Sequence, residues 1–136
     1  MNLAMKSYTI QSQQRNEMID ITDTIKHHIQ EKKIQQGAVI VYVPHTTAGV
    51  TINEGADPDV QRDLITTLNR LIPKQGDYRH SEGNSDAHIK ASLLGSSVTI
   101  LIENNAPLLG TWQHIFFYEG DGPRKRTFYM MTLPKK

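Results

Sequence analysis

A continuous apolar run, AVIVYVP, occupies residues 38–44 and constrains the fold more than any other stretch of the chain. Most of its residues are β-branched, and a run that is apolar on both faces is typical of a strand buried at the centre of a sheet. The run ends directly before His45. We therefore expect this histidine at the end of a central strand, where functional groups are often found.

Residues 22–37 have the apolar spacing of a helix, and Gly37 is suited to a left-handed C-terminal stop. The isoleucines of its apolar face are Ile21, Ile25, Ile29 and, less regularly, Ile34. A second helix is predicted over residues 57–73, where Asp57 suits the N-cap and Pro58 the first helical position. Both helices should pack an apolar stripe against the sheet.

The other segments predict a third, shorter helix and several strands. The helix should begin at residue 84 or 85 and end at Gly95, and the strands should cover residues 7–12, 96–104, 110–120 and 126–133. DGPRK, residues 121–125, should join the last two strands as a hairpin, because Asp-Gly is a common turn signal. This order predicts an α+β fold with about three helices and a largely antiparallel or mixed sheet, in one domain over residues 1–136.

Composition excludes several kinds of site. The chain has 15 Lys and Arg against 14 Asp and Glu, a formal charge of +1, so no general field favours nucleic acid or an acidic membrane. It has no cysteine, which excludes disulfides and thiolate metal ligands. No apolar segment has the length of a signal sequence or a membrane span, so we expect a cytoplasmic protein that binds neither membranes nor nucleic acid.

YRHSEGNSDAHIKA, residues 78–91, has many groups that bind protons, metals or anions. His80 lies in the predicted loop and His88 early in the short helix, with Glu82 and Asp86 nearby. Together with His45 they offer the nitrogen ligands that zinc prefers, although the spacing is not that of a helical metal pair. Two alternatives remain open: hydrogen bonds to the backbone, and direct acid–base or phosphate contact.

Other polar residues are candidates for contact with a substrate. The start of the short helix, with Asn84 or Ser85 as its cap, predicts a site for phosphate or carboxylate, although Glu82 opposes an anion there. Two hydroxyls, Thr46 and Thr47, directly follow His45. Glu54 should lie in a turn, either exposed or as a base or metal ligand facing the pocket of His45.

The GTWQ segment and the following basic segment complete the candidate set. Trp112 and Gln113 should point to opposite faces of a strand, with Trp112 in the core and Gln113 free to bind a pyrimidine-like edge or a neighbouring chain. Arg124 and Arg126 are either solvated hairpin cations or a clamp for phosphate or pyrophosphate, which arginine binds with two hydrogen bonds.

Three of these segments resemble one protein family. HTTAGVTINEGADPDV, YRHSEGNSDAHIKASLLGSS and LLGTWQHIFFYEGDGPRKR are similar to the YjbQ-like family, also described as secondary thiamine-phosphate synthase enzymes, and the likeness runs from about Tyr8 to Leu133. One departure is Asn105, where the family usually has glycine. Asparagine is the commonest substitute in a left-handed turn, so we expect that turn to be kept.

The resemblance implies a sheet curled toward a sandwich or barrel, a homotrimer with sites near subunit boundaries, and a metal bound by His45, His80 and His88. It also implies weak thiamine phosphate synthesis, in which a pyrimidine methyl pyrophosphate is joined to a thiazole phosphate. Arg124 and Arg126 would then neutralise the leaving pyrophosphate, Asn84 and Ser85 would bind a phosphate, and Glu54, Glu82 or Gln113 would orient reacting groups.

Two questions stay open at this point. Pyrophosphate chemistry usually uses Mg²⁺, whereas three histidines favour zinc, so the native reaction is expected to differ from the named one. The alternative to an enzyme is a metal- or metabolite-binding homotrimer without turnover.

Overall fold

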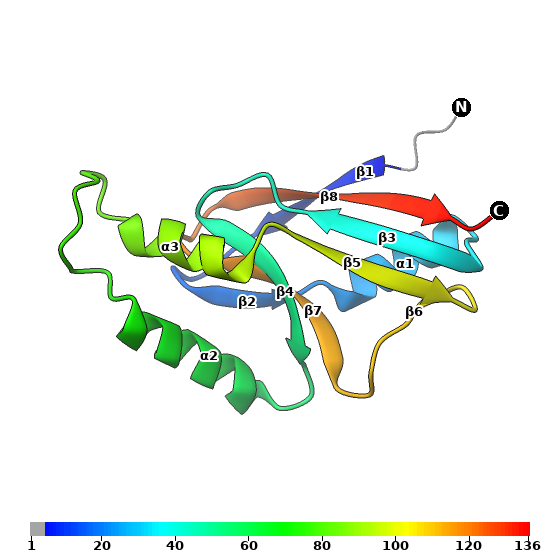
Figure 1. Ribbon diagram of the computed structural model, residues 1–136, viewed down its shortest axis with the longest axis horizontal. Helices are drawn as coiled ribbons and strands as arrows, with labels where there is room; N and C mark the ends of the chain where they lie inside the picture. Colours follow the sequence, from blue (N-terminus) through cyan, green and yellow to red (C-terminus); the bar gives the residue numbers. More distant parts are fainter. Residues whose placement is uncertain (1–4) are drawn as a thin grey trace.

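The computed structural model describes residues 5–136, which form three helices and two antiparallel sheets (Figure 1). The larger sheet has the order β1 (Met5–Gln11), β8 (Lys125–Pro134), β3 (Gln36–Tyr42), β5 (Ser97–Glu103) and β6 (Ala106–Pro107). The smaller sheet has the order β2 (Glu17–Asp20), β7 (Gln113–Glu119) and β4 (Ala48–Glu54). The predicted α+β class is confirmed, with the antiparallel strands curled around one core.

The core lies between the two sheets and is completed by helix α1 (Thr22–Glu31). Its residues come from α1, both sheets and the adjoining turns: Ile21, Ile25, Ile29, Ile34, Val39, Val41, Val43, Ala48, Val50, Ile100, Ile102, Ile115, Phe117, Phe128 and Met130. Helix α3 (Ser85–Leu94) packs on β4, and α2 (Pro58–Leu71) lies further out (Figure 1). None of the residues of α2 is buried, although Asp57 accepts the predicted capping hydrogen bond from the backbone N–H of Asp59.

Strand β3 is central, as predicted, but only one of its faces is buried. Val39 and Val41 are inaccessible, whereas Tyr42 on the opposite face is 48% exposed. Its neighbours β8 and β5 have the same alternation, because Met130 and Ile100 point inward while Met131 and Leu101 are exposed. The outer face of the larger sheet therefore presents apolar side chains to solvent.

Helix α1 ends at Glu31, earlier than the predicted stop at Gly37. Lys33 has a left-handed backbone (φ 54°). The left-handed residue that follows the helix is therefore Lys33, not the predicted Gly37. Gly37 instead belongs to β3, where a Cβ atom would lie 2.2 Å from the carbonyl oxygen of Leu133. The glycine is needed because β8 approaches the backbone closely, not because a helix ends.

Two strands were not predicted from the sequence. Residues 48–54 form β4, and residues 17–20 form the unpredicted β2; both pair with β7. The predicted hairpin at 121–125 is wrong. Strands β7 and β8 belong to different sheets, so this segment crosses from one sheet to the other.

Two expectations near β7 had opposite outcomes. Trp112 is 62% exposed rather than buried, because β7 begins only at Gln113 and the tryptophan lies in the preceding loop. Asn105 does take the left-handed conformation (φ 61°), and its Nδ2 donates to the carbonyl oxygens of Ile29 and Ile34. The asparagine thus keeps the turn and also ties it to the end of α1.

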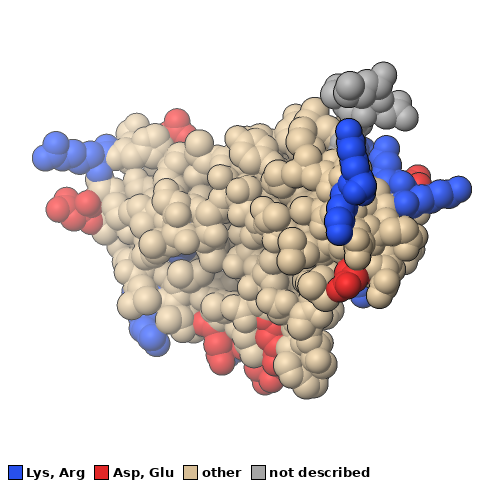
Figure 2. Space-filling view, turned by 45° about the vertical axis from the view of Figure 1, so that its right-hand side comes forward, with Lys and Arg blue, Asp and Glu red and all other residues tan. Residues whose placement is uncertain are grey.

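Charged side chains on the face shown in Figure 2 lie around its edge, with both signs present, and uncharged side chains occupy the centre. This distribution agrees with a net charge of +1. Within residues 5–136, no helix has the length and apolar character needed to cross a membrane.

Candidate functional site

Two neighbouring pockets share one side chain, that of His88 on α3. The first, of about 390 Å³, is lined by residues of the 77–80 loop and the start of α3, including Arg79, His80 and Ser85. The second, of about 370 Å³, lies between the turn after β3 and α3, and is lined by His45, Thr46, Ser92 and Ser96 among others. The candidate site is therefore centred on His88.

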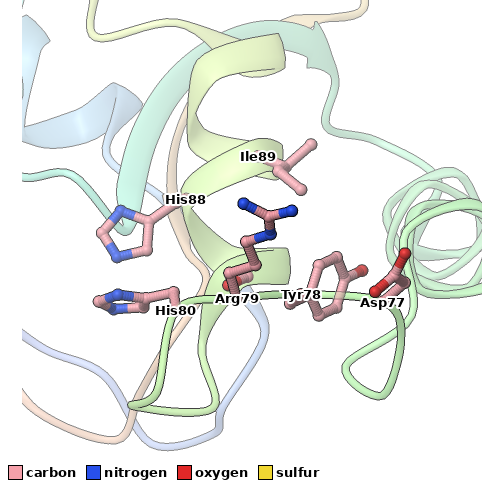
Figure 3. A pocket seen from close by; sticks show the side chains of 7 residues that line it. Asp77, Tyr78, Arg79, His80, His88 and Ile89 are labelled. Atoms are coloured by element: carbon pink, nitrogen blue, oxygen red, sulfur yellow. The ribbon is translucent and has the colours of Figure 1, made fainter.

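His80 and His88 lie side by side in the first pocket (Figure 3). Their ring centroids are 5.2 Å apart and their planes are nearly perpendicular. Two imidazoles on a tetrahedral zinc, with Zn–N distances of about 2.0–2.1 Å, have ring centres about 5 Å apart. The separation of the two rings is thus that of two imidazoles on one zinc ion.

One acidic side chain, that of Glu82, lies near this pair. An oxygen of Glu82 is 3.9 Å from Nε2 of His80, and the Glu82 side chain is 73% exposed. Within residues 5–136 of a single chain, no three His, Asp or Glu side chains gather closely enough to hold a metal ion.

His45 enters the second pocket from the turn between β3 and β4. Its Nε2 lies 3.0 Å from both the backbone nitrogen and the carbonyl oxygen of Thr127. Burial and the nearby Arg126 guanidinium lower the pKa of His45 below its ordinary value, which favours the neutral ring. The structure brings His45 and His88 to one pocket and His80 and His88 to the other.

Arg126 and Thr47, both predicted to bind phosphate, form a buried network instead. Arg126 is 4% exposed and donates to Glu119 through Nε (2.9 Å) and Nη2 (2.5 Å). The same Nη2 donates to the hydroxyl of Thr47 at 2.8 Å. Burial alone would raise the pKa of Glu119, but hydrogen bonds from Arg126, the backbone of Asp121 and Ser12 outweigh it and lower the pKa.

A second buried network lies behind α3 and was missed from the sequence. Asp86 is inaccessible; it accepts two hydrogen bonds from Arg15, each 2.9 Å long, and one from the buried Lys90 at 3.1 Å. Lys90 also donates to Asn69 on α2. The only signal in the sequence was the four-residue spacing of Asp86 and Lys90, because Arg15 lies 71 positions away.

Of the two phosphate ligands predicted at the start of α3, one lines a pocket and the other binds Asp121. Ser85 lines the first pocket. Asn84 stands at the N-cap, but its side chain does not cap the helix; Nδ2 donates to Asp121 at 2.8 Å, and Oδ1 is buried without a partner among the described residues. Arg124, half exposed, donates to the same Asp121 side chain and is thereby linked to the helix start.

Glu54 and Gln113 lie together but away from both pockets. They face each other across β4 and β7, and Glu54 accepts a hydrogen bond from the backbone of Asp57. The prediction that Glu54 lies in a turn is wrong, because it ends a strand that starts at Ala48. Six residue steps along a strand correspond to about 20 Å, which separates Glu54 from the His45 side of the chain.

Arg79 is a site residue that sequence reasoning missed. It lines the first pocket next to His80, and its side chain extends along α3 toward Ile89 (Figure 3). Its position directly before His80 in YRH was the available signal.

The model of the family described as "UPF0047 protein YjbQ-like" matches residues 6–135. This chain belongs to that family. It is 55% identical over 129 residues to a UPF0047 protein of Methanocaldococcus jannaschii, with 95% of this chain and 94% of that protein covered. It is 47% identical over 130 residues to the UPF0047 protein YugU of Bacillus subtilis, with 95% and 98% covered.

Solved structures of YjbQ-like proteins have the same fold. The YjbQ/UPF0047 family protein of Clostridium acetobutylicum matches with a TM-score of 0.93 at 50% identity, over 94% of this chain and 99% of that one. A YbjQ-like protein of unknown function from Sulfolobus solfataricus matches with the same TM-score at 26% identity, over 98% and 99%. The fold of this YjbQ-like chain is thus common to bacterial and archaeal relatives.

Acid should weaken this YjbQ-like fold through Asp86. Burial alone would raise the pKa of Asp86, but hydrogen bonds from Arg15 and Lys90 outweigh it and lower the pKa from 3.8 to about 2. Because the folded-state pKa is the lower one, the ionised carboxylate stabilises the fold above about pH 4, by roughly 2 kcal/mol, and this contribution disappears as the pH falls toward 2. Urea unfolding at pH 6 and pH 3 measures it.

Asp86→Asn should be much less stable than the natural chain at pH 6, by up to about 3–5 kcal/mol, because the buried Lys90 and the partly buried Arg15 lose their partner. The difference should shrink at pH 3. The exposed Asp63 provides the control as Asp63→Asn, which should change little at either pH. A difference for Asp86→Asn that is equal at both pH values would contradict this account.

Proposed function

We propose that this chain is an enzyme of phosphorylated small molecules, with thiamine phosphate synthesis as a detectable and secondary reaction. The observation that carries the proposal is the position of His88 between two pockets, with His80 at a zinc-like separation on one side and His45 on the other. Arg79 and Ser85 add a cation and a hydroxyl to the first pocket, which is a suitable set for a phosphate. Family membership by itself supports no particular reaction.

The reaction makes modest demands on the protein. The thiazole nitrogen attacks the methylene carbon of the pyrimidine, a C–N bond forms, the C–O bond breaks, and pyrophosphate leaves with the electron pair. No proton has to be transferred in this step, so the protein's tasks are to align the reactants and to neutralise the leaving group.

This chain's residues can divide those tasks between the two pockets. Arg79 would take charge from the leaving pyrophosphate, and Arg124, which is linked through Asp121 to Asn84 at the start of α3, would add a second cation. Ser85 would donate a hydrogen bond to a phosphate oxygen in the first pocket, and Thr46 and His45 would do so in the second. Arg126 and Thr47 are left out of this proposal because their polar groups already bind Glu119 and each other.

We also propose a divalent metal at His80 and His88, with His45 on the far side of His88. Zinc is the metal that neutral imidazoles favour, while Mg²⁺ would enter only with the pyrophosphate. When bound, zinc supplies Lewis-acid polarisation of an oxygen. This preference supports a native reaction other than thiamine phosphate synthesis, on a substrate that also carries phosphate.

Activity and metal content of matched variants test the proposal. His88→Ala should lose zinc and lower the rate of thiamine phosphate formation by at least about tenfold, since it removes one side of both pockets. His27→Ala is the control, because His27 is an exposed histidine on α1 far from either pocket. Arg79→Ala should lower the rate at constant zinc content, and the exposed Arg62→Ala should not.

Each outcome of this comparison has a meaning. Equal zinc and equal rates in His88→Ala and His27→Ala would contradict the site. Zinc binding lost in His88→Ala, with no product from any variant including the natural chain, would favour the alternative, a metal- or metabolite-binding protein without turnover.

We further propose that copies of this chain associate through the outer face of the larger sheet, as the homotrimer that the family resemblance implies. Five apolar side chains of that face are at least 40% exposed: Met5, Tyr42, Leu101, Met131 and Leu133. Three of them, Met5, Tyr42 and Met131, line a hollow of about 480 Å³ that also reaches Ser97, next to Ser96 of the His45 pocket. Burial of such a face by another copy would place the candidate site beside a subunit boundary.

Light scattering after gel filtration measures this association. The natural chain should have three times its chain mass of 15.4 kDa, and Met131→Glu should shift the mass toward that of a single chain. Leu71→Glu, on α2, is the control, since Leu71 is also apolar and 69% exposed but lies elsewhere. A single-chain mass for the natural protein, or dissociation by Leu71→Glu alone, would contradict this interface.

A further inference from the structure

We infer that Nδ1 is the functional nitrogen of His45, and that Arg126 positions it. The inference deepens the proposed function, because it assumes that the second pocket binds a metal or a phosphorylated ligand. It goes beyond that function by assigning separate roles to the two ring nitrogens and a role to a buried arginine that touches no pocket.

The first observation is the anchoring of Nε2. Both polar atoms of the Thr127 main chain lie 3.0 Å from this nitrogen. If Nε2 carries the proton, it donates to the Thr127 carbonyl oxygen; if it does not, it accepts from the Thr127 N–H. In either tautomer Nε2 is engaged by the backbone, and Nδ1 has no hydrogen-bond partner among the described residues.

The second observation concerns the two ends of the turn that carries His45. Thr127 binds the imidazole at one end, and the adjacent Arg126 binds both the hydroxyl and the carbonyl oxygen of Thr47 at the other, at 2.8 and 3.2 Å. Gly120 also donates its N–H to the Thr47 carbonyl oxygen, at 3.0 Å. One dipeptide of β8 thus fixes residues 45–47 against the sheet.

Arg126 is itself fixed by the carboxylate of Glu119, which is fully buried. Ser12 donates to the same carboxylate at 2.8 Å. The guanidinium therefore cannot turn toward a ligand without leaving a buried carboxylate unpaired, which is strongly unfavourable. Arg126 consequently acts on the pocket through Thr47 and the position of the His45 ring.

Because both polar atoms of the Thr127 main chain lie 3.0 Å from Nε2, this nitrogen has a backbone hydrogen-bond partner in either tautomer. With the proton on Nε2, Nδ1 presents a lone pair, and metal-binding histidines commonly donate their other nitrogen to a backbone carbonyl in this manner. With the proton on Nδ1, the ring presents an N–H to an anionic oxygen. The same imidazole can therefore serve as a ligand, an acceptor or a donor in the second pocket.

Two isosteric variants separate the nitrogens. The amide of His45→Asn occupies the place of Nδ1, and that of His45→Gln reaches the place of Nε2. Titration calorimetry with inorganic pyrophosphate should give His45→Asn an affinity within about tenfold of the natural chain, and His45→Gln a loss of about 10–100-fold, similar to His45→Ala. The reverse order would overturn the inference.

Nitrogen-15 NMR of the imidazoles provides a readout that does not need a ligand. In the free protein, Nε2 of His45 should show either scalar coupling to the Thr127 amide or a slowly exchanging proton, and Nδ1 should show neither. Engagement of Nδ1 in place of Nε2 would overturn the inference. Because this spectrum needs no ligand, it tests the anchoring of Nε2 even if the natural chain did not bind pyrophosphate, a result that would count against the proposed function instead.

Positioning by Arg126 has its own test. Thr47→Val removes one acceptor with little change in shape, and Arg126→Lys keeps the buried charge but loses the forked geometry. Both variants should weaken pyrophosphate binding by several-fold and shift the His45 nitrogen resonances, while Thr66→Val, at an exposed position of α2, should leave both unchanged. Unchanged His45 resonances in folded Thr47→Val and Arg126→Lys would refute the positioning role.

Discussion

The buried ion pair between Arg126 and Glu119 is the interaction on which the arrangement of this molecule depends. Glu119 ends β7 in the smaller sheet, and Arg126 lies at the start of β8 in the larger sheet, so the pair joins the two sheets across their connection. Loss of one partner from such a pair typically costs about 3–5 kcal/mol, because the other charge stays buried. Ser12 and Thr47 bind the same pair, which brings the end of β1 and the turn after β3 to one point.

The candidate site forms beside this point for a topological reason. Strand β3 delivers His45 to the turn that Arg126 fixes, and β4 carries the chain back along the smaller sheet, where α3 packs against it. His88 on α3 thereby faces the His45 turn, while His80 in the preceding loop approaches His88 from the other side. The buried network around Asp86 holds the start of α3 against Arg15, and so fixes the direction in which His88 points.

Local signals predicted the parts of this structure that depend on local physics. The central strand at 38–44 and the helix cap at Asp57 each rest on neighbouring residues, and each was confirmed. The left-handed turn at Asn105 was expected from the family resemblance and was also confirmed. The errors came from long-range pairing. Asp121-Gly122 looks like a hairpin turn, yet strands β7 and β8 each pair with other strands, and no nearby residue signals which partner a strand will choose.

In the candidate site, too, the sequence indicated the local features and missed those that depend on long-range packing. The sequence indicated that the histidines matter, and the structure places His80 with His88 and His45 with His88. The sequence did not indicate that Arg126 and Thr47 belong to a buried network, because Glu119 becomes their neighbour only after the two sheets pack. Arginine in a basic surface segment and arginine in a buried ion pair have the same local sequence, so burial decided a role that residue type could not.

X-ray absorption at the zinc edge tests the central claim, a metal-binding site centred on His88, most directly. The spectrum of the zinc-loaded protein should show at least two imidazole ligands with Zn–N distances of about 2.0–2.1 Å, and that imidazole signal should be lost in His88→Ala. A zinc spectrum with oxygen ligands alone, or one that is the same in the natural chain and in His88→Ala, would contradict the account.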